Sequence, residues 1–338
     1  THCISSAASD VYKRQIYVVV RALEREFLMK NNKMIAMMLT MSMLAAAFAG
    51  CLGGDDEDDT PDWSISMASD VSADFVESAW DPIIPNLNAG DMCDAIISAM
   101  TKTDEREQVV DFTRAYYTSS QGVIGGSGAA SISAVADLNA EGTTIGVQSG
   151  TTSDLYAQNN LGAATISAYD DFPSVIAALN NGDVHYAMGD APVLSLEGTL
   201  MVTFSDENFG MAVQGDSSGE LLGALNMAIG ALVDSGEYDL IYGASFDGAV
   251  TLADDTTMDT ATSYPVPTEG SDLTAVLESG SLRLCTDPFY PPFESYADDG
   301  SVVGFDADIA HAVADEIAAH YMGACLLYTS DAADDMQC

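Results

Sequence analysis

The feature that most constrains the fold is a segment near the C-terminus that has the pattern of a domain's beginning. The sequence LRLCTDPFYPPFESYADDGSVVGFDADIA, from Leu282 to Ala310, predicts a strand, a proline-rich turn at an aromatic pair and an amphipathic helix. Such a helix should lead onward to more sheet, yet the 338-residue chain stops soon after it. The strand therefore either joins residues that precede it or opens a second domain that the chain does not finish.

The two ends of the chain carry a related pair of sequences. SSAASDVYKRQ (5–15) and CLLYTSDAADD (325–335) can be encoded by the two strands of one oligonucleotide, read in different frames. We interpret residues 1–28 as adaptor-like sequence and leader, and 324–338 as adaptor-like sequence, and we expect no function from either. Three cysteines fall in these ends: Cys3, Cys325 and Cys338.

Residues 29–50 have the pattern of an export signal. Lysines follow Met29, and an apolar run of fifteen residues from Met34 to Phe48 comes next. The run resembles the core of a signal peptide and is short for a membrane span, which needs about 20 residues. We therefore expect export, with translation beginning at Met29 or Met34.

The signal ends in FAGC at Cys51, which resembles a lipobox, the motif whose cysteine becomes lipid-modified after cleavage. Residues 51–70 follow as an acidic stretch with little to bury, which predicts a solvated tether. The sequence thus predicts an extracytoplasmic protein, in a periplasm or at a cell surface, anchored to the membrane by lipid. An ordinary secretory signal with an incidental cysteine is the alternative.

Net charge limits the possible partners. Lys and Arg number 10 against 52 Asp and Glu, so the formal charge is −42. Such a chain repels nucleic acid and anionic lipid surfaces, and we expect no nucleic-acid partner. Because 48% of the residues are hydrophobic, the dispersed acidity indicates a folded halophilic or marine protein. Between Cys51 and Ala324, four basic residues remain: Lys102, Arg106, Arg114 and Arg283.

From Val71 onward, short β-rich runs alternate with helical stretches, which predicts an α/β fold. Strands are predicted at 94–100, 143–150 and 185–190, and helices at 153–161, 171–182 and 218–242. Ligands of open parallel sheets bind beyond the carboxyl ends of the strands, so we expect the site there. The stretch 249–272, rich in Thr, Asp and Pro without a sustained period, predicts a linker.

Seven stretches resemble one family. They are LRLCTDPFYPPFE, GFDADIAHAVADEI, WDPIIPNLNAG, ISAMTKTDEREQVVDFTRAYY, IGVQSGTTSDLYAQ, GDAPV and GEYDLIYGASF. Together they are similar to the type-2 periplasmic solute-binding proteins of polar amino-acid ABC transporters, over residues 71–246 and 273–322. The resemblance implies a two-lobed α/β fold, with two parallel-type sheets joined by a two-strand hinge and no cofactor or metal.

The order of these stretches departs from the family, in which TDPFYPPFE and GFDADIA come first. Here they come last. A circular permutation, a tandem pair with a truncated second copy, and an assembly error that collapsed a repeat all explain the order. The 24-residue linker reaches about 80 Å at ~3.3 Å per residue, so the chain can close on itself. We predict one two-lobed domain completed by its own C-terminal segment.

The predicted lobes follow from this closure. Lobe 1 takes residues 71–120, 211–248 and 273–323, and lobe 2 takes residues 121–210. The crossings near Ser120 and Gly210 form the hinge, and ligand binding closes the lobes. Cys93 and Cys285 are expected at opposite ends of neighbouring parallel strands. They are too few for a disulfide framework, and we predict free thiols.

A free amino acid presents a carboxylate, an ammonium and a side chain. Arg106 is the candidate for the carboxylate, because a guanidinium grips it through two parallel hydrogen bonds. The resemblance implies that Asp190 takes the ammonium. Surface pairing of Arg106 with Asp104 or Glu107, and an N-cap role for Asp190, are the alternatives. The resemblance also implies further hydrogen bonds to the carboxylate from Ser98, Ala99, Thr101, Thr151 and Thr152.

Aromatic residues complete the predicted site. Tyr290 and Trp80 match the family's walls around the ligand side chain, although both could instead be core residues. Asp287 would face the distal part of the ligand, and Gln148 stands at a selectivity position. That pair points to a polar or basic ligand. Arg114 departs from the family, whose members commonly carry an acidic residue there.

The sequence therefore predicts the amino-acid receptor of an ABC importer, which docks on its permease and is not an enzyme. One alternative is a cyclohexadienyl or arogenate-type dehydratase, because some relatives have that activity, but no base with an orienting partner is evident. The four histidines have no metal-ligand spacing. The chain could also be a sensor module, or a fragment that does not bind because residues 273–322 fail to fold back.

Overall fold

The computed structural model describes residues 68, 70–215, 217, 219–247, 252 and 263–331, with side chains as far as Met322. Nearly all of these residues belong to one compact unit, Ser64–Val233 with Tyr238–Cys338. The other unit, Thr1–Trp63 with Asp234–Glu237, lies almost wholly outside the described residues. The predicted signal peptide, Cys51 and most of the tether and linker also lie outside them.

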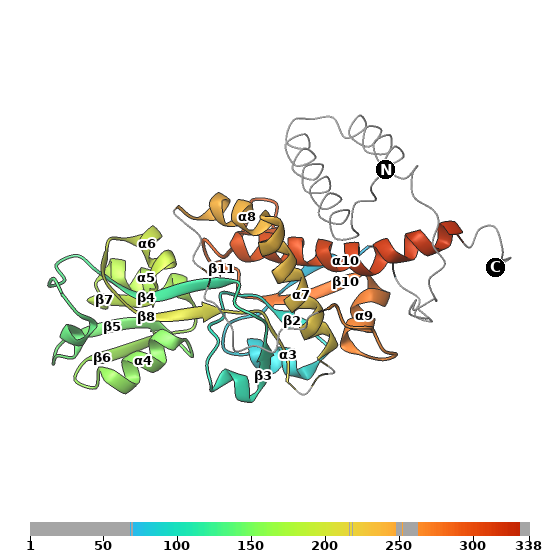
Figure 1. Ribbon diagram of the computed structural model, residues 1–338. Helices are drawn as coiled ribbons and strands as arrows, with labels where there is room; N and C mark the ends of the chain where they lie inside the picture. The colour runs from blue at the N-terminus through green and yellow to red at the C-terminus, as the bar shows by residue number, and fades with distance from the viewer. Residues whose placement is uncertain are drawn as a thin grey trace. The chain divides into compact units, whose positions relative to one another are not determined.

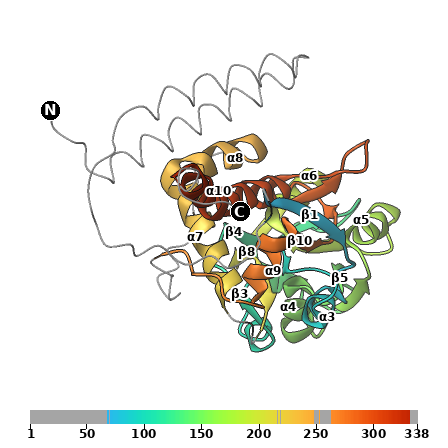
Figure 2. The same cartoon turned by 90° about the vertical axis from the view of Figure 1, so that its right-hand side faces the viewer.

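Lobe 1 is built on a five-stranded sheet in the order β1-β10-β2-β9-β3. The strands are β1 (Ser72–Glu77), β10 (Ser281–Thr286), β2 (Ala95–Ile96), β9 (Ala212–Gln214) and β3 (Val110–Phe112). β10 is parallel to both β1 and β2, whereas β9 is antiparallel to β2 and β3. The late strand, orange in Figures 1 and 2, thus lies inside the sheet beside blue β1.

Helices accompany this sheet. They are α3 (Ile83–Ala89), the 3₁₀ helix η1 (Arg106–Gln108), α7 (Glu220–Ser235), α8 (Glu237–Ser245), α9 (Asp272–Ser279) and α10 (Phe305–Asp331). The predicted helix at 218–242 is divided between α7 and α8 by Gly236, whose φ of 80° is left-handed.

The C-terminal segment enters lobe 1 through a tight turn. Ser271 caps α9 by accepting a hydrogen bond from the Thr274 amide, and Gly280 ends the helix with φ 70°. A Cβ at Gly280 would lie 2.7 Å from the carbonyl oxygen of Asp70, so only glycine fits. The Gly280 carbonyl then accepts from the Ser72 amide at 2.9 Å, which sets the register of β10 against β1.

Between β10 and α10, a small antiparallel sheet carries residues to the cleft. It comprises β11 (Phe289–Tyr290), β12 (Glu294–Tyr296) and β13 (Val302–Val303). Phe293 and Phe305 flank it and are fully buried. Their rings pack on Tyr117, at centroid distances of 4.9 and 5.5 Å. Aromatic pairs at this spacing are attractive, so they hold the late segment against the start of β4 (Tyr117–Gly125), a strand of the predicted hinge.

An ion pair also fastens β10. Arg283 donates through Nη2 to Asp94 Oδ1 at 2.6 Å and through Nε to Asp94 Oδ2 at 3.2 Å. The Arg283 amide donates to the same Oδ2 at 2.8 Å. This forked geometry joins β10 to the residue that precedes β2.

The prediction of free thiols is wrong. Cys93 and Cys285 form a disulfide, with Cα atoms 5.6 Å apart. The prediction took Cys93 to lie near the start of a strand running from Asp94 to Met100, but β2 comprises only Ala95–Ile96. Because the chain bends before β2, Cys93 packs with Cys285 in one buried apolar cluster beside Leu87. The strands are neighbours and parallel, as expected, but β2 begins opposite the carboxyl end of β10, with Ala95 paired to Leu284 and Ile96 to Cys285. The error therefore lies in the assumed register.

Lobe 2 has a second five-stranded sheet, in the order β6-β5-β7-β4-β8. Its strands are β4 (Tyr117–Gly125), β5 (Thr144–Gln148), β6 (Thr165–Tyr169), β7 (Tyr186–Asp190) and β8 (Leu200–Phe209), and its helices are η2 (Val135–Leu138), α4 (Thr152–Asn160), α5 (Phe172–Asn181) and α6 (Ala191–Glu197). β5 is parallel to β6 and β7, and β4 is antiparallel to β7 and β8. The predicted α/β fold with two sheets is confirmed; each sheet mixes parallel and antiparallel pairs.

β4 and β8 are the two strands at the predicted hinge. They pair from Tyr117 with Phe209 to Ile124 with Leu200, and the register shifts between Ser120 and Gln121. Such an irregularity bends a strand locally. The lobe boundaries and the hinge movement stay predictions.

Candidate ligand-binding cleft

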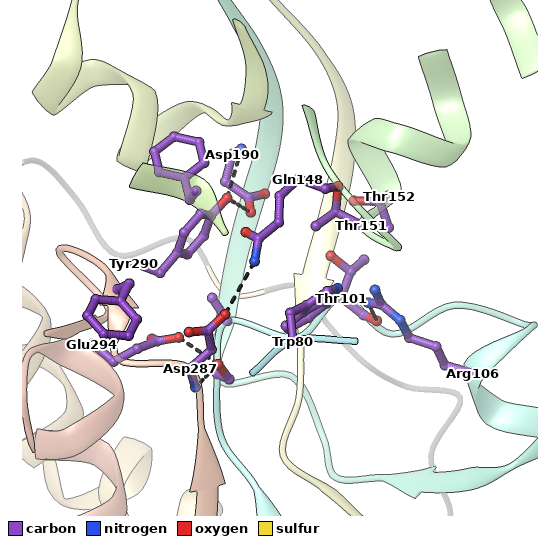
Figure 3. Close-up of a pocket in the computed structure, with 14 residues that line it drawn as sticks. Trp80, Thr101, Arg106, Gln148, Thr151, Thr152, Asp190, Asp287, Tyr290 and Glu294 are labelled. Carbon is purple, nitrogen blue, oxygen red and sulfur yellow. Dashed lines mark hydrogen bonds between the residues drawn. The ribbon is translucent and has the colours of Figure 1, made fainter. Parts of the chain in front are cut away.

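One cleft is lined by all eleven residues that the sequence analysis selected for ligand binding (Figure 3). They are Trp80, Ser98, Ala99, Thr101, Arg106, Gln148, Thr151, Thr152, Asp190, Asp287 and Tyr290, and they are joined by Phe172, Phe289 and Glu294. The space is about 410 Å³, counted with the solvent at its mouth. The late segment supplies four of the lining residues: Asp287, Phe289, Tyr290 and Glu294.

Arg106 stands at one side of the cleft, at the start of η1. Its Nη1 donates to the Thr101 carbonyl at 2.7 Å and its Nη2 to the Gly150 carbonyl at 3.4 Å. The guanidinium carbon lies 5.1 Å from the centroid of the Trp80 ring, within cation–π distance. Burial lowers the pKa of Arg106 to about 10, opposed by nearby acidic groups, so the side chain stays charged at neutral pH. None of its described hydrogen bonds reaches Asp104 or Glu107.

Asp190 stands on the opposite side, at the end of β7. Its Oδ2 accepts from the Tyr290 hydroxyl at 2.7 Å, and its Oδ1 accepts from Gln121 Nε2 at 2.8 Å. Burial first, and then the nearby charge of Glu207, raise its pKa to about 7. Asp190 holds the N-cap position of α6, but its side chain makes no capping hydrogen bond. The carboxylate is therefore directed to the cleft network.

Tyr290 joins the late segment to lobe 2. Its hydroxyl bonds Asp190, and its ring meets Phe172 edge to face with centroids 5.0 Å apart. Burial raises the pKa of Tyr290 well above its usual value, so it remains a donor. Trp80 lines the cleft and also packs against the apolar core of lobe 1. The wall and core roles considered for Trp80 are thus compatible.

Asp287 and Gln148 meet across the cleft, where Gln148 Nε2 donates to Asp287 Oδ2 at 3.2 Å (Figure 3). Burial raises the pKa of Asp287 to about 6. A carboxylate and a neutral amide on facing walls suit a ligand group that donates hydrogen bonds.

A second pair of acids lies at the floor of the cleft. Ser98 donates to Glu294 Oε1 at 2.7 Å, while Asp306 Oδ2 accepts from the Ala99 amide at 2.7 Å and the Tyr116 hydroxyl at 2.9 Å. Burial and mutual repulsion raise the pKa of Glu294 well above its usual range. Burial raises the pKa of Asp306 to about 6.

The predicted hydrogen-bond donors to a ligand carboxylate have partners within the protein. The Ala99 amide donates to Asp306, and the Thr151 hydroxyl donates to the Gln148 carbonyl at 2.7 Å while it caps α4. The Thr101 and Thr152 hydroxyls both donate to Glu207 Oε2, at 2.7 and 3.0 Å. Among the residues predicted to bind the ligand carboxylate, Arg106 keeps the most unused donors, because a guanidinium carries five N–H groups.

Sequence reasoning missed the network behind the cleft. Glu207 and Gln121 connect the threonines to Asp190, and both are buried. Gln121 could have been noticed in the sequence, because it is a polar residue at the start of the apolar run QGVIG. Glu294 lies within the quoted PPFE stretch. Glu207 gave none, since SDEN has the pattern of an exposed acidic segment.

Arg114 does not line the cleft. Its amide donates to Asn226 Oδ1 at 2.6 Å, and its Nη1 lies 2.9 Å from where a Cβ at Gly230 would stand. The long side chain thus lies over a glycine of α7, which gives the arginine a packing role.

A family model described as bacterial extracellular solute-binding proteins, family 3, matches residues 64–247 and 282–322, which is more than half of the chain. The chain belongs to this family. The match includes the late segment that completes lobe 1. Among the described residues, no helix is both long and apolar enough to cross a membrane. Nor does any group of three or more His, Cys, Asp or Glu among them form a candidate metal site.

Several curated members of the family are similar to this chain. A probable histidine-binding protein of Neisseria gonorrhoeae is 31% identical over 196 residues, which is 54% of this chain and 71% of that protein. An L-arginine-binding protein of Pseudomonas aeruginosa is 33% identical, over 51% of this chain and 71% of that one. A solved structure, an ancestral arginine-binding protein bound to arginine, is 30% identical and covers 50% of this chain and 78% of that one, with a TM-score of 0.47.

Proposed function

We propose that this protein is an extracytoplasmic receptor that captures a free L-amino acid between its two lobes and presents it to an ABC permease. The observation that carries the proposal is that Arg106 and Asp190 line opposite sides of one cleft. A zwitterion needs a cation for its carboxylate and an anion for its ammonium. The names of the curated relatives, which bind histidine and arginine, support the same class of ligand.

The ligand side chain is polar or basic. Asp287 and Gln148 present acceptor oxygens from facing walls of the cleft, and the rings of Trp80 and Tyr290 also line the space. An aromatic face attracts a cationic head group or stacks on an aliphatic stem. Among the lining residues Arg106 is the one permanent cation, and three carboxyls line the same space: Asp190, Asp287 and Glu294. This excess of acid favours arginine, lysine, histidine or glutamine over acidic amino acids.

Closure of the lobes supplies the signal to the permease. Hydrogen bonds cross the cleft from Gln148 to Asp287 and from Tyr290 to Asp190. A ligand that bonds both walls favours the closed form through its differential affinity for it. Lipid attachment at Cys51 and an acidic tether would keep the receptor at the membrane; both lie outside the described residues.

Calorimetric titration of the full chain against the twenty amino acids tests the proposal. We expect saturable binding of one or more polar or basic amino acids, and loss of at least about a hundredfold in affinity for Arg106→Lys, because an ammonium cannot replace a forked guanidinium. Arg114→Lys is the matched control and should bind normally. Binding that Arg106→Lys does not affect would contradict the proposed role of Arg106.

The receptor is proposed to have no catalytic activity. Incubation with prephenate or arogenate, followed by detection of the aromatic product, separates a binding protein from a dehydratase. We expect no product at any concentration that saturates binding; steady turnover would replace the receptor assignment with an enzyme.

A further inference from the structure

Glu207 lies behind the cleft in the hinge strand β8 and is 7% exposed. Its Oε2 accepts three hydrogen bonds: from Thr101 Oγ1 at 2.7 Å, Thr152 Oγ1 at 3.0 Å and Gln121 Nε2 at 3.0 Å. Thr101 comes from the lobe 1 side, whereas Thr152 and Gln121 come from lobe 2. One carboxylate oxygen therefore fixes the two threonines that face the cleft from either lobe.

The direction of these hydrogen bonds follows from chemistry. A carboxylate oxygen only accepts, and each hydroxyl has a single hydrogen. The hydrogens of Thr101 and Thr152 therefore point at Glu207, away from the cleft that both residues line. Toward the cleft, each hydroxyl can present only acceptor lone pairs.

Gln121 likewise directs its hydrogens toward protein acceptors, on the side of the cleft where Asp190 lies. Ser153 donates to Gln121 Oε1, so the amide NH₂ faces Asp190 Oδ1 at 2.8 Å and Thr152 Oγ1 at 3.3 Å as well as Glu207. The two hydrogens of this NH₂ serve the shorter contacts, to Asp190 Oδ1 and to Glu207 Oε2 at 3.0 Å, so Thr152 Oγ1 keeps its acceptor lone pairs for the cleft. Because one nitrogen contacts both Asp190 and Thr152, these acceptors are neighbours, and a single ammonium can reach both.

We propose that Glu207 is a positioning residue that makes Thr101 and Thr152 acceptors for the ammonium side of a ligand, instead of donors to its carboxylate. This inference rests on the proposed amino-acid-binding function. It reverses the role that the sequence analysis expected for the two threonines. The ligand carboxylate then depends on Arg106, and the ammonium is shared by Asp190 and the threonine hydroxyls.

Ligands that lack one charged group test the polarity of the threonines. L-Arginine carries both groups, agmatine lacks the carboxylate, and 5-guanidinopentanoate lacks the ammonium. Thr152→Val removes one hydroxyl. We expect the affinity for arginine and for agmatine to fall about fivefold, the usual worth of one hydrogen bond, and the affinity for 5-guanidinopentanoate to stay unchanged.

The opposite pattern, in which Thr152→Val weakens 5-guanidinopentanoate and spares agmatine, would overturn the inference and return the hydroxyl to the carboxylate. Failure of the wild-type chain to bind any of the three ligands would overturn this inference, which commits to a basic ligand, whereas saturable binding of another polar amino acid in the calorimetric titration would leave the proposed receptor standing. The two failures are thereby distinguished.

Variants of Glu207 test its positioning role. Glu207→Met keeps the length of the side chain without an acceptor, whereas Glu207→Gln keeps an acceptor oxygen and removes the charge. We expect Glu207→Met to turn the hydroxyls toward the cleft, so that loss of the ligand carboxylate costs about tenfold more affinity than in the wild type. Glu207→Gln should keep the wild-type preference.

Asp206→Asn is the matched control, because Asp206 is the exposed neighbour of Glu207 in β8 and the variant changes the charge equally. It should leave all three affinities unchanged. If a folded Glu207→Met loses no more affinity than the wild type when the ligand lacks its carboxylate, the positioning role is refuted. If Glu207→Gln loses as much extra affinity as Glu207→Met, the role is also refuted, because the effect then comes from the charge of Glu207. If Glu207→Met does not fold, the Thr152→Val comparison decides the question by itself.

Discussion

Lobe 2 and lobe 1 carry similar sheets but are assembled in different ways. In lobe 2 the strands and helices from β4 to β8 follow one another along the chain, and α4 and α5 connect the parallel strands β5, β6 and β7. In lobe 1, Ser72 pairs with Ser281, and β10 lies between strands that precede it by most of the chain. Long loops cost conformational entropy to close, and lobe 1 bears that cost.

Lobe 1 offsets this cost with long-range contacts, of which the disulfide and the ion pair have no counterpart among the described residues of lobe 2. The Cys93–Cys285 disulfide, the Arg283–Asp94 ion pair and the packing of Phe293 on Tyr117 all join the late segment to earlier residues. An unusual segment order can therefore still give a complete cleft when long-range contacts hold it. We expect damage to these contacts to affect lobe 1 selectively.

Removal of the late segment should have the largest effect. A chain that ends at Asp272 lacks β10, Tyr290 and Asp287, and it exposes the edges of β1 and β2. We expect no measurable amino-acid binding and rapid hydrogen exchange in lobe 1, while β5 and β7 of lobe 2 stay protected. A chain that ends at Ala324 is the control. Undiminished affinity in the shorter chain would refute self-completion.

Loss of the disulfide should come next. The bond spans a sequence separation of 192 residues. The chain-entropy relation then gives about 5 kcal/mol of stabilisation as an upper value. The Cys93→Ser, Cys285→Ser double variant should unfold in less urea than the wild type, with the loss confined to lobe 1. A reductant should shift the wild type equally and leave the variant unchanged; insensitivity of the wild type would contradict the bond.

A moderate effect is expected from pH, because Asp190 of lobe 2 bonds Tyr290 of the late segment. With a pKa of about 7 for Asp190, its ionised fraction grows from pH 6 to pH 8. Affinity for an ammonium-bearing ligand should rise about tenfold over that interval. Arg106, Glu207, Tyr290 and Ser119 also face Asp190. Asp190→Asn should bind weakly at every pH, and an unchanged pH profile in that variant would exclude Asp190 as its origin.

Stability should respond to pH in the opposite sense. A raised pKa means that the folded chain binds the proton more strongly than the unfolded chain does, over a window from about pH 4 to about pH 7. The contribution of Asp190 to the free energy of unfolding therefore falls as pH rises through that window. Urea titrations at pH 5 and pH 7 should show a smaller decrease for Asp190→Asn than for the wild type.

The smallest effect should come from the surface ion pair. Arg283 is 38% exposed, and exposed pairs contribute about 1 kcal/mol or less. Arg283→Gln should lower the free energy of unfolding of lobe 1 by no more than that and leave lobe 2 unchanged. Asp94→Asn should give the same loss, and the double variant should add nothing. Additive losses would show that the two side chains do not act on each other.

The sequence predicted which segments lie together better than it predicted their local geometry. The β-rich runs and family-like stretches indicated that 282–286 belongs with the start of lobe 1, and β10 lies there. The same patterns overextended β2, because the apolar run from Ala95 to Met100 continues after the strand ends at Ile96. Hydrophobicity also does not report register. The disulfide was missed because β2 begins opposite the carboxyl end of β10, which brings Cys93 near Cys285.

In the cleft, residue types indicated which side chains meet a ligand, but not which hydrogen bonds they use. Arg106 stands out because only four basic residues lie between Cys51 and Ala324, and Asp190 because the stretch GDAPV resembles the family. The orientation of a threonine hydroxyl depends on Glu207 and Gln121, which lie far away in sequence. No local pattern contains that information.

Hydrogen exchange in β10 of the full chain is the sharpest test of self-completion, because this strand completes both lobe 1 and the cleft. We expect amides from Leu282 to Thr286 to exchange as slowly as those of β1, since the two strands share six register pairs. Exchange of these amides at the rate of an unstructured chain, with lobe 2 still protected, would contradict self-completion.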